Sequence, residues 1–294
     1  MHRWIILLVL LLLSLPVTAQ QGREDRPPRP DAFNLSYGEL NRHRLDLYLP
    51  EGDAAVPVVL MIHGGGYFAG SKTIMGPLAA DLRLRGYAVV VPNYRLAPFD
   101  PYPAPINDLA CALAWTHAHA EDYHFDTERV VVLGESAGGN AALLLGAHDN
   151  LETHLDDCPH PAPTNTDWAQ AVVAYYPIVD LSSCLGEPVC AGARRAMALY
   201  LDVTTYTPDL LGDANPLSQL DADDAPVLLI HGTVDFVVPP SESELYAARL
   251  ADVGIVHELL LIDGANHAFA YEMDLDEAQQ AVTAVDGWLA ALWE

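Results

Sequence analysis

The stretch Gly134-Glu135-Ser136-Ala137-Gly138 constrains the fold of this chain more than any other. An apolar run at residues 130–133 precedes it, and a helix-prone run at 140–145 follows. Strand, tight turn and helix are the context in which a Gly-x-Ser-x-Gly turn holds its serine in a strained conformation. The glycines at both ends carry no side chain, so strand and helix can approach closely around the turn. The pattern therefore predicts that Ser136 is a nucleophile.

A serine hydroxyl becomes a nucleophile at neutral pH only when a base takes its proton and an acid orients that base. With this turn, the acid and then a histidine follow the serine along the chain. Asp235 follows the apolar run 226–230, and His267 follows the apolar run 257–262. Because open α/β sheets bring their chemistry to the carboxyl ends of strands, we expect Asp235 to orient His267 as the base. Asp263, close to the histidine in sequence, is the alternative acid.

A second glycine-rich stretch, His63-Gly64-Gly65-Gly66-Tyr67, follows an apolar run at 58–62. Successive glycines let backbone N–H groups turn toward one point without steric hindrance. Donors of this kind stabilise the oxyanion of a tetrahedral intermediate. We predict that the N–H groups of Gly65, Gly66 and Ala137 form such an oxyanion hole. His63 is expected to brace the loop, because the base belongs last in the chain order.

Apolar runs without polar alternation indicate strands buried on both faces of a parallel sheet. Helical patterns between them indicate right-handed crossovers. The expected fold class is α/β, with a mostly parallel central sheet flanked by helices. The expected strands lie at residues 45–49, 57–62, 87–92, 129–133, 171–175, 227–230 and 256–262, and the expected helices at 75–85, 104–119, 137–147, 241–252 and 276–292. Proline- and acid-rich insertions at 149–167 and 181–224 are expected to form short lid or wall segments.

Residues 1–19 have the pattern of a secretory signal peptide, with a basic start, an apolar core and a small-residue cleavage site. An uncleaved membrane anchor is the alternative, although the apolar stretch is short for a bilayer span. Residues 20–36 are expected to be a flexible linker, because their prolines and mixed charges show no periodicity. Residues 37–294 are expected to form one catalytic domain. The protein is then secreted or periplasmic, with no stable membrane span after signal cleavage.

Four cysteines suit an exported chain, since disulfides persist in oxidising compartments. Of the three possible pairings, we favour Cys111–Cys158 together with Cys184–Cys190; buried free thiols are the alternative. The formal net charge of −26 argues against nucleic acids and anionic membranes as partners. No cysteine or histidine spacing predicts a metal site, no cofactor is expected, and the sequence leaves the oligomeric state open.

Together these motifs resemble the α/β-hydrolase esterases, in particular the hormone-sensitive-lipase-like group and the bacterial feruloyl-esterase-like branch. The resemblance spans about residues 37 to 293. Further matches are Val91-Pro92-Asn93-Tyr94-Arg95-Leu96-Ala97-Pro98, Tyr175-Tyr176-Pro177 and Gly264-Ala265-Asn266-His267-Ala268-Phe269. The Asp-Pro-Leu-x-Asp acid motif of the hormone-sensitive-lipase-like group is absent. In its place the chain has His231-Gly232-Thr233-Val234-Asp235, which favours the feruloyl-esterase-like branch.

The resemblance implies a carboxylic ester hydrolase whose substrate is a small-molecule ester with a short-chain or aryl group. A serine exopeptidase of the prolyl-oligopeptidase type has a similar final Asp–His segment, but such enzymes normally carry a large propeller domain, for which this chain has no room. A non-catalytic binding module on the same fold would be expected to lack a member of the triad. We also expect Arg95 and Asp108 to form a buried pair and His231 to be structural. Candidates for lining an acyl or aryl pocket are Tyr67, Phe68, Tyr102, Trp168 and Phe236.

Overall fold

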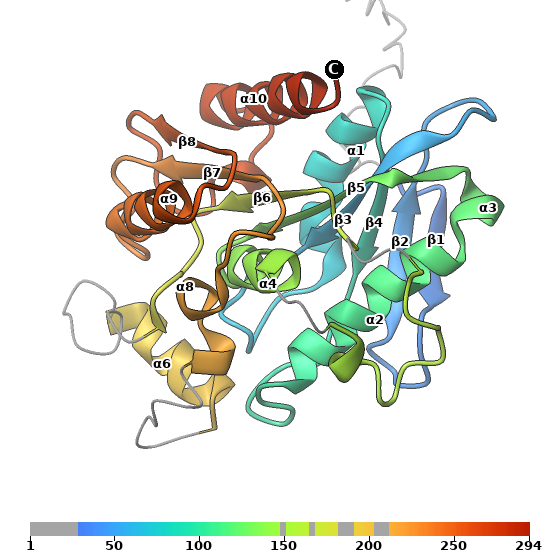
Figure 1. Cartoon of the computed structure of the whole chain (residues 1–294), viewed down its shortest axis with the longest axis horizontal. Coiled ribbons are helices and arrows are strands. Elements are labelled where there is room, and N and C mark those ends of the chain that lie inside the picture. The colour runs from blue at the N-terminus through green and yellow to red at the C-terminus, as the bar shows by residue number, and fades with distance from the viewer. Residues whose placement is uncertain (1–28, 148–150, 165–167, 182–190, 203–211) are drawn as a thin grey trace, which may run out of the picture.

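A twisted sheet with helices on both faces forms the centre of the molecule (Figure 1). The computed structural model describes residues 29–147, 151–164, 168–181, 191–202 and 212–294. The strands are β1 (Ala32–Ser36), β2 (Arg44–Tyr48), β3 (Val56–Ile62), β4 (Ala88–Pro92), β5 (Phe125–Glu135), β6 (Ala171–Tyr175), β7 (Val227–Gly232) and β8 (His257–Ile262). They form an eight-stranded sheet in the order β1-β2-β4-β3-β5-β6-β7-β8. β2 is antiparallel to β1 and β4, and the other neighbouring pairs are parallel.

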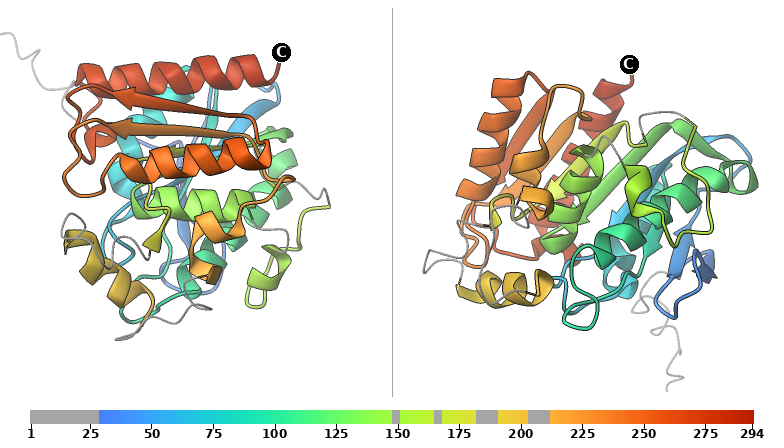
Figure 2. Two further views of the ribbon diagram at one scale, coloured as in Figure 1. Left: turned by 60° about the vertical axis from the view of Figure 1, so that its left-hand side comes forward. Right: turned by 60° about the horizontal axis from the view of Figure 1, so that its bottom comes forward.

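The longer helices are divided between the two faces of this sheet. They are α1 (Gly76–Leu84), α2 (Ala104–Ala118), α4 (Ala137–Ala147), α9 (Ser241–Val253) and α10 (Asp276–Leu292). Helices α1 and α10 cover one face, and α2, α4 and α9 cover the other (Figure 2). Shorter elements are α3 (Ala120–Tyr123), α6 (Ala191–Tyr200), α8 (Pro216–Gln219), η1 (Lys72–Met75), η2 (Leu151–His154) and η4 (Phe269–Tyr271).

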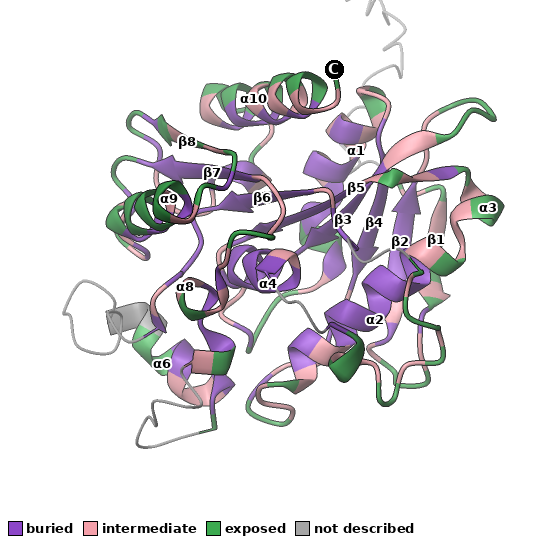
Figure 3. Ribbon diagram, in the orientation of Figure 1, coloured by how far each residue is buried: buried purple, intermediate pink, exposed green. Residues whose placement is uncertain are grey.

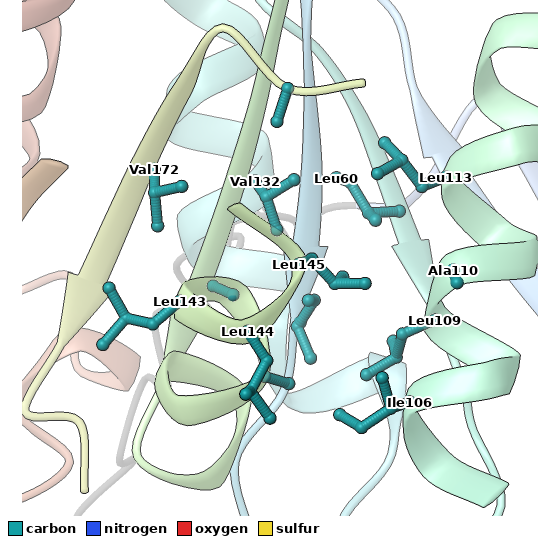
Figure 4. Close-up of a cluster of buried hydrophobic side chains, with 14 of the residues drawn as sticks. Leu60, Ile106, Leu109, Ala110, Leu113, Val132, Leu143, Leu144, Leu145 and Val172 are labelled. Atoms are coloured by element: carbon teal, nitrogen blue, oxygen red, sulfur yellow. The ribbon is translucent and has the colours of Figure 1, made fainter. Parts of the chain in front are cut away.

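Two apolar cores lie on opposite sides of the sheet. Along β3, Leu60 and Ile62 pack in the core beneath α2 and α4, whereas Val59 and Met61 pack in the core beneath α1 and α10. In Figure 4, Leu60 of the sheet and leucines of α2 and α4 meet in the first of these cores. The central strands are buried, and the outer sides of α9 and α10 are exposed (Figure 3). Because both faces of each central strand are covered, its side chains are apolar without alternation.

Each expected strand and helix is present, with its ends shifted by a few residues, and the α/β fold class is confirmed. The linker expected at 20–36 is wrong at its C-terminal end. Ala32–Ser36 forms β1 on the edge of the sheet, where the N–H of Asn34 donates to Asp46 at 2.8 Å. A five-residue edge strand lacks the buried apolar run that revealed the other strands. Residues 1–28 lie outside the described part of the chain.

A disulfide joins Cys111 on α2 to Cys158, with 5.5 Å between the Cα atoms. This is one of the two bonds favoured from the sequence, and it ties part of the insertion at 149–167 to α2. Cys184 and Cys190 lie outside the described residues. In the described ranges, no helix combines the length and the apolar character needed to cross a bilayer.

The expected pairing of Arg95 with Asp108 is also present. The Arg95 side chain donates to the Asp108 carboxylate through Nε at 2.9 Å and Nη2 at 2.7 Å. His43 Nε2 lies 2.9 Å from the same carboxylate, an interaction that sequence reasoning did not find. Asp108 is buried, so these partners compensate for its lost hydration. The cluster fixes the start of β2 and the loop after β4 against α2.

Four parallel strands deliver the predicted site residues to one edge of the sheet. β3 runs into the glycine loop, β5 into Ser136, β7 into the loop that holds Asp235, and β8 into the loop that holds His267. Because neighbouring parallel strands end on the same side, residues far apart in sequence meet there.

Candidate active site

The turn between β5 and α4 has the strained geometry that its glycines permit. Ser136 has a φ of 54°, in the left-handed region that non-glycine residues rarely adopt. A Cβ on Gly134 would lie 2.0 Å from the carbonyl oxygen of Gly138, and one on Gly138 would lie 2.3 Å from that of Ile62. The N–H of Ser136 donates to the Tyr175 carbonyl at 2.9 Å, which anchors the turn to β6. Any side chain at either glycine would therefore force the turn apart.

The structure brings Ser136, His267 and Asp235 into one hydrogen-bonded chain. His267 Nε2 lies 3.0 Å from Ser136 Oγ, and His267 Nδ1 lies 2.7 Å from Asp235 Oδ2. The carboxylate can only accept a proton from Nδ1, so it favours the tautomer whose free lone pair is on Nε2. That lone pair faces the serine hydroxyl. The arrangement is one in which a histidine can take the serine proton.

Asp235 is held by more than the histidine. Its Oδ1 accepts the N–H groups of Val237 and Val238 at 2.8 and 2.9 Å. Burial alone would raise the pKa of this carboxyl, but hydrogen bonds from His231, His267 and the backbone outweigh burial and hold the pKa well below its usual value. Asp235 is therefore ionised at neutral pH and oriented by the backbone.

Asp263 and His63 lie outside the hydrogen-bonded chain of Ser136, His267 and Asp235. Asp263 is exposed, and its Oδ1 lies 3.2 Å from the hydroxyl of Thr233. His63 is buried, packs on Tyr94 with ring centroids 4.3 Å apart, and contacts the Gly64 carbonyl through Nδ1 at 2.7 Å. Burial lowers the pKa of His63 to about 4, so the ring is neutral and braces the loop from behind.

His231 also has a structural environment. Its Nδ1 lies 2.7 Å from the Ser243 hydroxyl, and its Nε2 lies 3.0 Å from the Val238 carbonyl. Nε2 is also 3.4 Å from Asp235 Oδ2. The ring therefore joins β7 and α9 to the loop that carries the acid.

The glycine loop after β3 runs beside Ser136. Gly65 and Gly66 have φ values of 112° and 62°. A Cβ on Gly64 would lie 3.2 Å from the Cβ of Ser136, and one on Gly65 would lie 2.3 Å from the Ala69 carbonyl. Within the described residues, the N–H groups of Gly65 and Gly66 donate to no acceptor. The N–H of Ala137 is also available, because the first residues of a helix have no intrahelical acceptor.

A cavity of about 440 Å³ opens above the serine. Its described lining is mainly apolar, with Ser136 and His267 as the reactive groups, and none of the described lining residues is an aspartate, glutamate, lysine or arginine. The remaining lining residues are Gly65, Gly66, Phe68, Ala69, Ile74, Tyr176, Ile178, Ala196, Val237, Val238, Ala268 and Tyr271. Of the aromatic pocket candidates, Phe68 lines the cavity. Tyr67 is buried and stacks on Tyr200 with ring centroids 3.8 Å apart.

Several functional neighbours escaped sequence reasoning. Ala196 belongs to α6, so part of the insertion at 181–224 forms a wall of the cavity. Tyr176 packs on His267, with ring centroids 4.7 Å apart, and Tyr271 lies against the glycine loop. Glu135, a fully buried carboxyl, contacts both tyrosines. An acidic residue at the end of an otherwise apolar strand was the available signal for this contact.

The mostly parallel sheet, the helix layers and the serine turn at the end of β5 define an α/β-hydrolase. The BD-FAE family model matches residues 45–250, most of the chain, and the protein therefore belongs to the BD-FAE family. In the described residues, no group of three or more histidine, cysteine, aspartate or glutamate side chains is placed to hold a metal ion.

Three known proteins illustrate the similarity. "Esterase LipC" of Mycobacterium tuberculosis is 29% identical over 84% of this chain, which spans 61% of that protein's length. "Ethyl acetate hydrolase" of Pseudomonas putida is 28% identical, over a match that covers 84% of this chain and 78% of the length of that protein. The structure of Esterase B from Lactobacillus rhamnosus aligns with a TM-score of 0.77 at 22% identity, covering 91% of this chain and 88% of that one.

Proposed function

We propose that this protein is a carboxylic ester hydrolase that works through a covalent acyl-enzyme on Ser136. The observation that carries the proposal is the hydrogen-bonded chain from Ser136 through His267 to Asp235, at 3.0 and 2.7 Å. The names of the relatives, an esterase and an ethyl acetate hydrolase, support the same reaction class.

Acylation begins when Ser136 Oγ attacks the ester carbonyl carbon and His267 Nε2 takes the hydroxyl proton. The carbonyl electron pair moves onto oxygen, where the N–H groups of Gly65, Gly66 and Ala137 stabilise the negative charge. As the intermediate collapses, the bond to the alcohol oxygen breaks and His267 protonates the departing alcohol. The acyl group remains bonded to the serine oxygen.

Deacylation repeats these steps with water in place of the serine hydroxyl. His267 takes a proton from water as the water oxygen attacks the acyl carbon, and then returns that proton to Ser136 Oγ as the carboxylic acid leaves. Asp235 keeps the ring oriented and stabilises its protonated form. Two backbone N–H groups on Oδ1 orient the carboxylate so that Oδ2 faces His267, with His231 Nε2 also nearby at 3.4 Å.

The cavity lining favours neutral esters with a short acyl or aryl group. Its walls are apolar, and its volume of about 440 Å³ falls in the usual range for small-molecule pockets. Among the lining residues that the structure describes, no carboxylate is placed to bind the amino terminus of a peptide, which disfavours the exopeptidase alternative. The intact hydrogen-bonded chain at Ser136 disfavours a non-catalytic binding module.

We also propose that the protein is exported after cleavage of residues 1–19. The disulfide between Cys111 and Cys158 supports this, because such bonds persist in oxidising compartments.

Ser136→Ala tests the catalytic proposal. Turnover of acetyl, butyryl and palmitoyl nitrophenyl esters and of a proline nitroanilide would be compared in the wild-type protein and in the variant. We expect the acetyl and butyryl esters to be the best substrates and Ser136→Ala to reduce kcat on the order of 10⁴–10⁶-fold. Ser241→Ala, an exposed serine at the start of α9, is the matched control.

A variant at Ser136 that keeps a tenth of the activity would exclude this serine as the nucleophile. Highest efficiency on the palmitoyl ester would indicate a lipase, and highest efficiency on the anilide would indicate a peptidase.

A further inference from the structure

Glu135 is a buried carboxyl that the proposed mechanism does not use. It is the last residue of β5, directly before Ser136, and its side chain has no solvent exposure. It is absent from the lining of the cavity. A carboxyl without hydration destabilises the fold unless neighbouring polar groups compensate. The groups that face it are phenols, namely Tyr176 and Tyr271 in contact, with Tyr94 and Tyr175 nearby.

The first contact leads to the catalytic histidine. The hydroxyl of Tyr176 donates to Glu135 Oε2 at 2.5 Å. The ring of Tyr176 packs on the ring of His267, with centroids 4.7 Å apart. Tyr176 itself has a φ of 38°, a conformation that needs support from its surroundings. Through this hydrogen bond, Glu135 therefore supports the Tyr176 ring on which the catalytic base His267 packs.

The second contact leads to the glycine loop. The hydroxyl of Tyr271 lies beside Gly64 and near enough to the Glu135 carboxyl to lower its pKa, and Glu135 Oε1 has no other hydrogen-bond partner among the described residues. A Cβ on Gly64 would lie 3.1 Å from this hydroxyl and 2.9 Å from the Glu135 carbonyl. Tyr271 is thereby fixed directly beside Gly65, the next residue along the loop. One carboxyl is linked to the base and to the oxyanion loop through two different tyrosines.

We infer that Glu135 is a positioning residue that fixes His267 and the oxyanion loop relative to Ser136, through the hydroxyls of Tyr176 and Tyr271. The inference rests on the proposed esterase function, because it assigns a role within that site. An apolar residue at this position could accept neither hydroxyl. Misplacing catalytic groups by about 1 Å can reduce turnover by about 100-fold, so a positioning contact of this kind has a measurable effect on kcat.

The charge state of Glu135 provides an independent signature. Burial raises the pKa of this carboxyl to about 8, against the opposing effect of the hydrogen bonds from Tyr176 and Tyr271. The carboxyl is therefore mostly neutral at pH 7 and ionises within the range in which ester hydrolysis can be assayed. A negative charge there opposes the oxyanion that forms beside Ser136.

Glu135→Ala and Glu135→Gln test the inference. Both variants would be assayed with butyryl nitrophenyl ester, and kcat would be expressed per active site from the burst of nitrophenol, so that unfolded protein does not count. We expect the alanine variant to lose about 10- to 100-fold in kcat with KM within about threefold, because Glu135 does not touch the cavity. The glutamine variant can still accept one hydroxyl and should stay within about threefold of the wild type.

The pH profile separates positioning from a merely structural role. Wild-type kcat should fall as the pH rises through 8, and the glutamine variant, which cannot ionise, should not show this fall. Tyr271→Phe removes one hydroxyl and no packing, so it keeps the test possible if the alanine variant does not fold; a loss of about 3- to 10-fold is expected, the range for losing one hydrogen bond. Tyr87→Phe is the control, since its hydroxyl bonds a carboxylate of Asp286 away from the site, at 2.9 Å.

Three results would overturn the inference. The first is an alanine variant, or Tyr271→Phe if the alanine variant does not fold, whose kcat stays within threefold of the wild type. The second is a glutamine variant as slow as the alanine variant, and the third is a pH profile of kcat that is the same for the wild type and for the glutamine variant. Failure of the proposed function looks different. In that case the wild-type protein shows no hydrolysis that depends on Ser136, whatever residue occupies position 135.

Discussion

Asp235→Asn changes the proton arrangement of the site while preserving its shape. In the wild-type protein, Asp235 Oδ1 accepts the N–H groups of Val237 and Val238 at 2.8 and 2.9 Å, and Oδ2 accepts His267 Nδ1 at 2.7 Å. An amide nitrogen cannot accept a hydrogen bond, so the asparagine must keep its oxygen toward the two backbone groups. Its NH₂ group then faces Nδ1, which has to become the acceptor.

This rearrangement moves the ring proton to Nε2, the atom that must take the proton of Ser136. We expect kcat at neutral pH to fall by about 10⁴-fold, the effect of the equivalent change in a serine protease triad, or about 5.4 kcal/mol of transition-state stabilisation. The fold should persist because both backbone hydrogen bonds to Oδ1 remain. The assay is hydrolysis of acetyl nitrophenyl ester, with thermal unfolding measured alongside.

Asp263→Asn is the matched control, because Asp263 is exposed and contacts the hydroxyl of Thr233 at 3.2 Å. We expect its kcat to stay within about twofold of the wild type. The tautomer argument is refuted if Asp235→Asn retains more than about one hundredth of the activity. A larger loss at Asp263 than at Asp235 would reassign the acid.

Three further predictions concern stability. Cys158→Ala opens a cross-link to Cys111 that spans 47 residues, so urea unfolding should show a loss of about 4 kcal/mol; an unchanged midpoint would contradict this. Asp108→Ala leaves Arg95 without its buried partner and should lower the free energy of unfolding by about 3–5 kcal/mol with KM unaltered; a loss below about 1 kcal/mol would count against a buried pair. Burial raises the pKa of Glu135 to about 8, so between about pH 4.3 and 8 the native state binds more protons than the unfolded chain, and stability falls as pH rises. Glu135→Gln should reduce that slope by up to about 1.4 kcal/mol per pH unit, and equal slopes in urea unfolding from pH 5 to 8 would disprove the assignment.

Much of the fold could be predicted from local patterns. Buried parallel strands have apolar side chains on both faces, so the strands at the centre of the sheet were visible as continuous apolar runs. The edge strand β1 was not, because Ala32–Ser36 is half exposed and short. The strained turn at Ser136 was also predictable, since it depends on the two glycines beside it and on the elements that flank it.

Which loop residues lie next to one another could not be predicted from local patterns. Asp235 and Asp263 both follow strands, and chain order alone left Asp263 as an alternative. Their roles separate in the structure, where Asp235 contacts His267 and Asp263 faces Thr233. The difference depends on the direction in which each loop leaves the sheet.

By itself, the sequence determined the α/β class, the serine turn, the glycine loop and the positions of the histidine and its acid candidates. These features depend on residues close together along the chain, whose backbone preferences and burial are local properties. Only the tertiary structure decided which acid meets His267, how Glu135 is linked to two tyrosines, and which part of the insertion walls the cavity. Those contacts join residues from separate strands, loops and helices, and the tertiary arrangement around the sheet, rather than any local pattern, sets the distances between them.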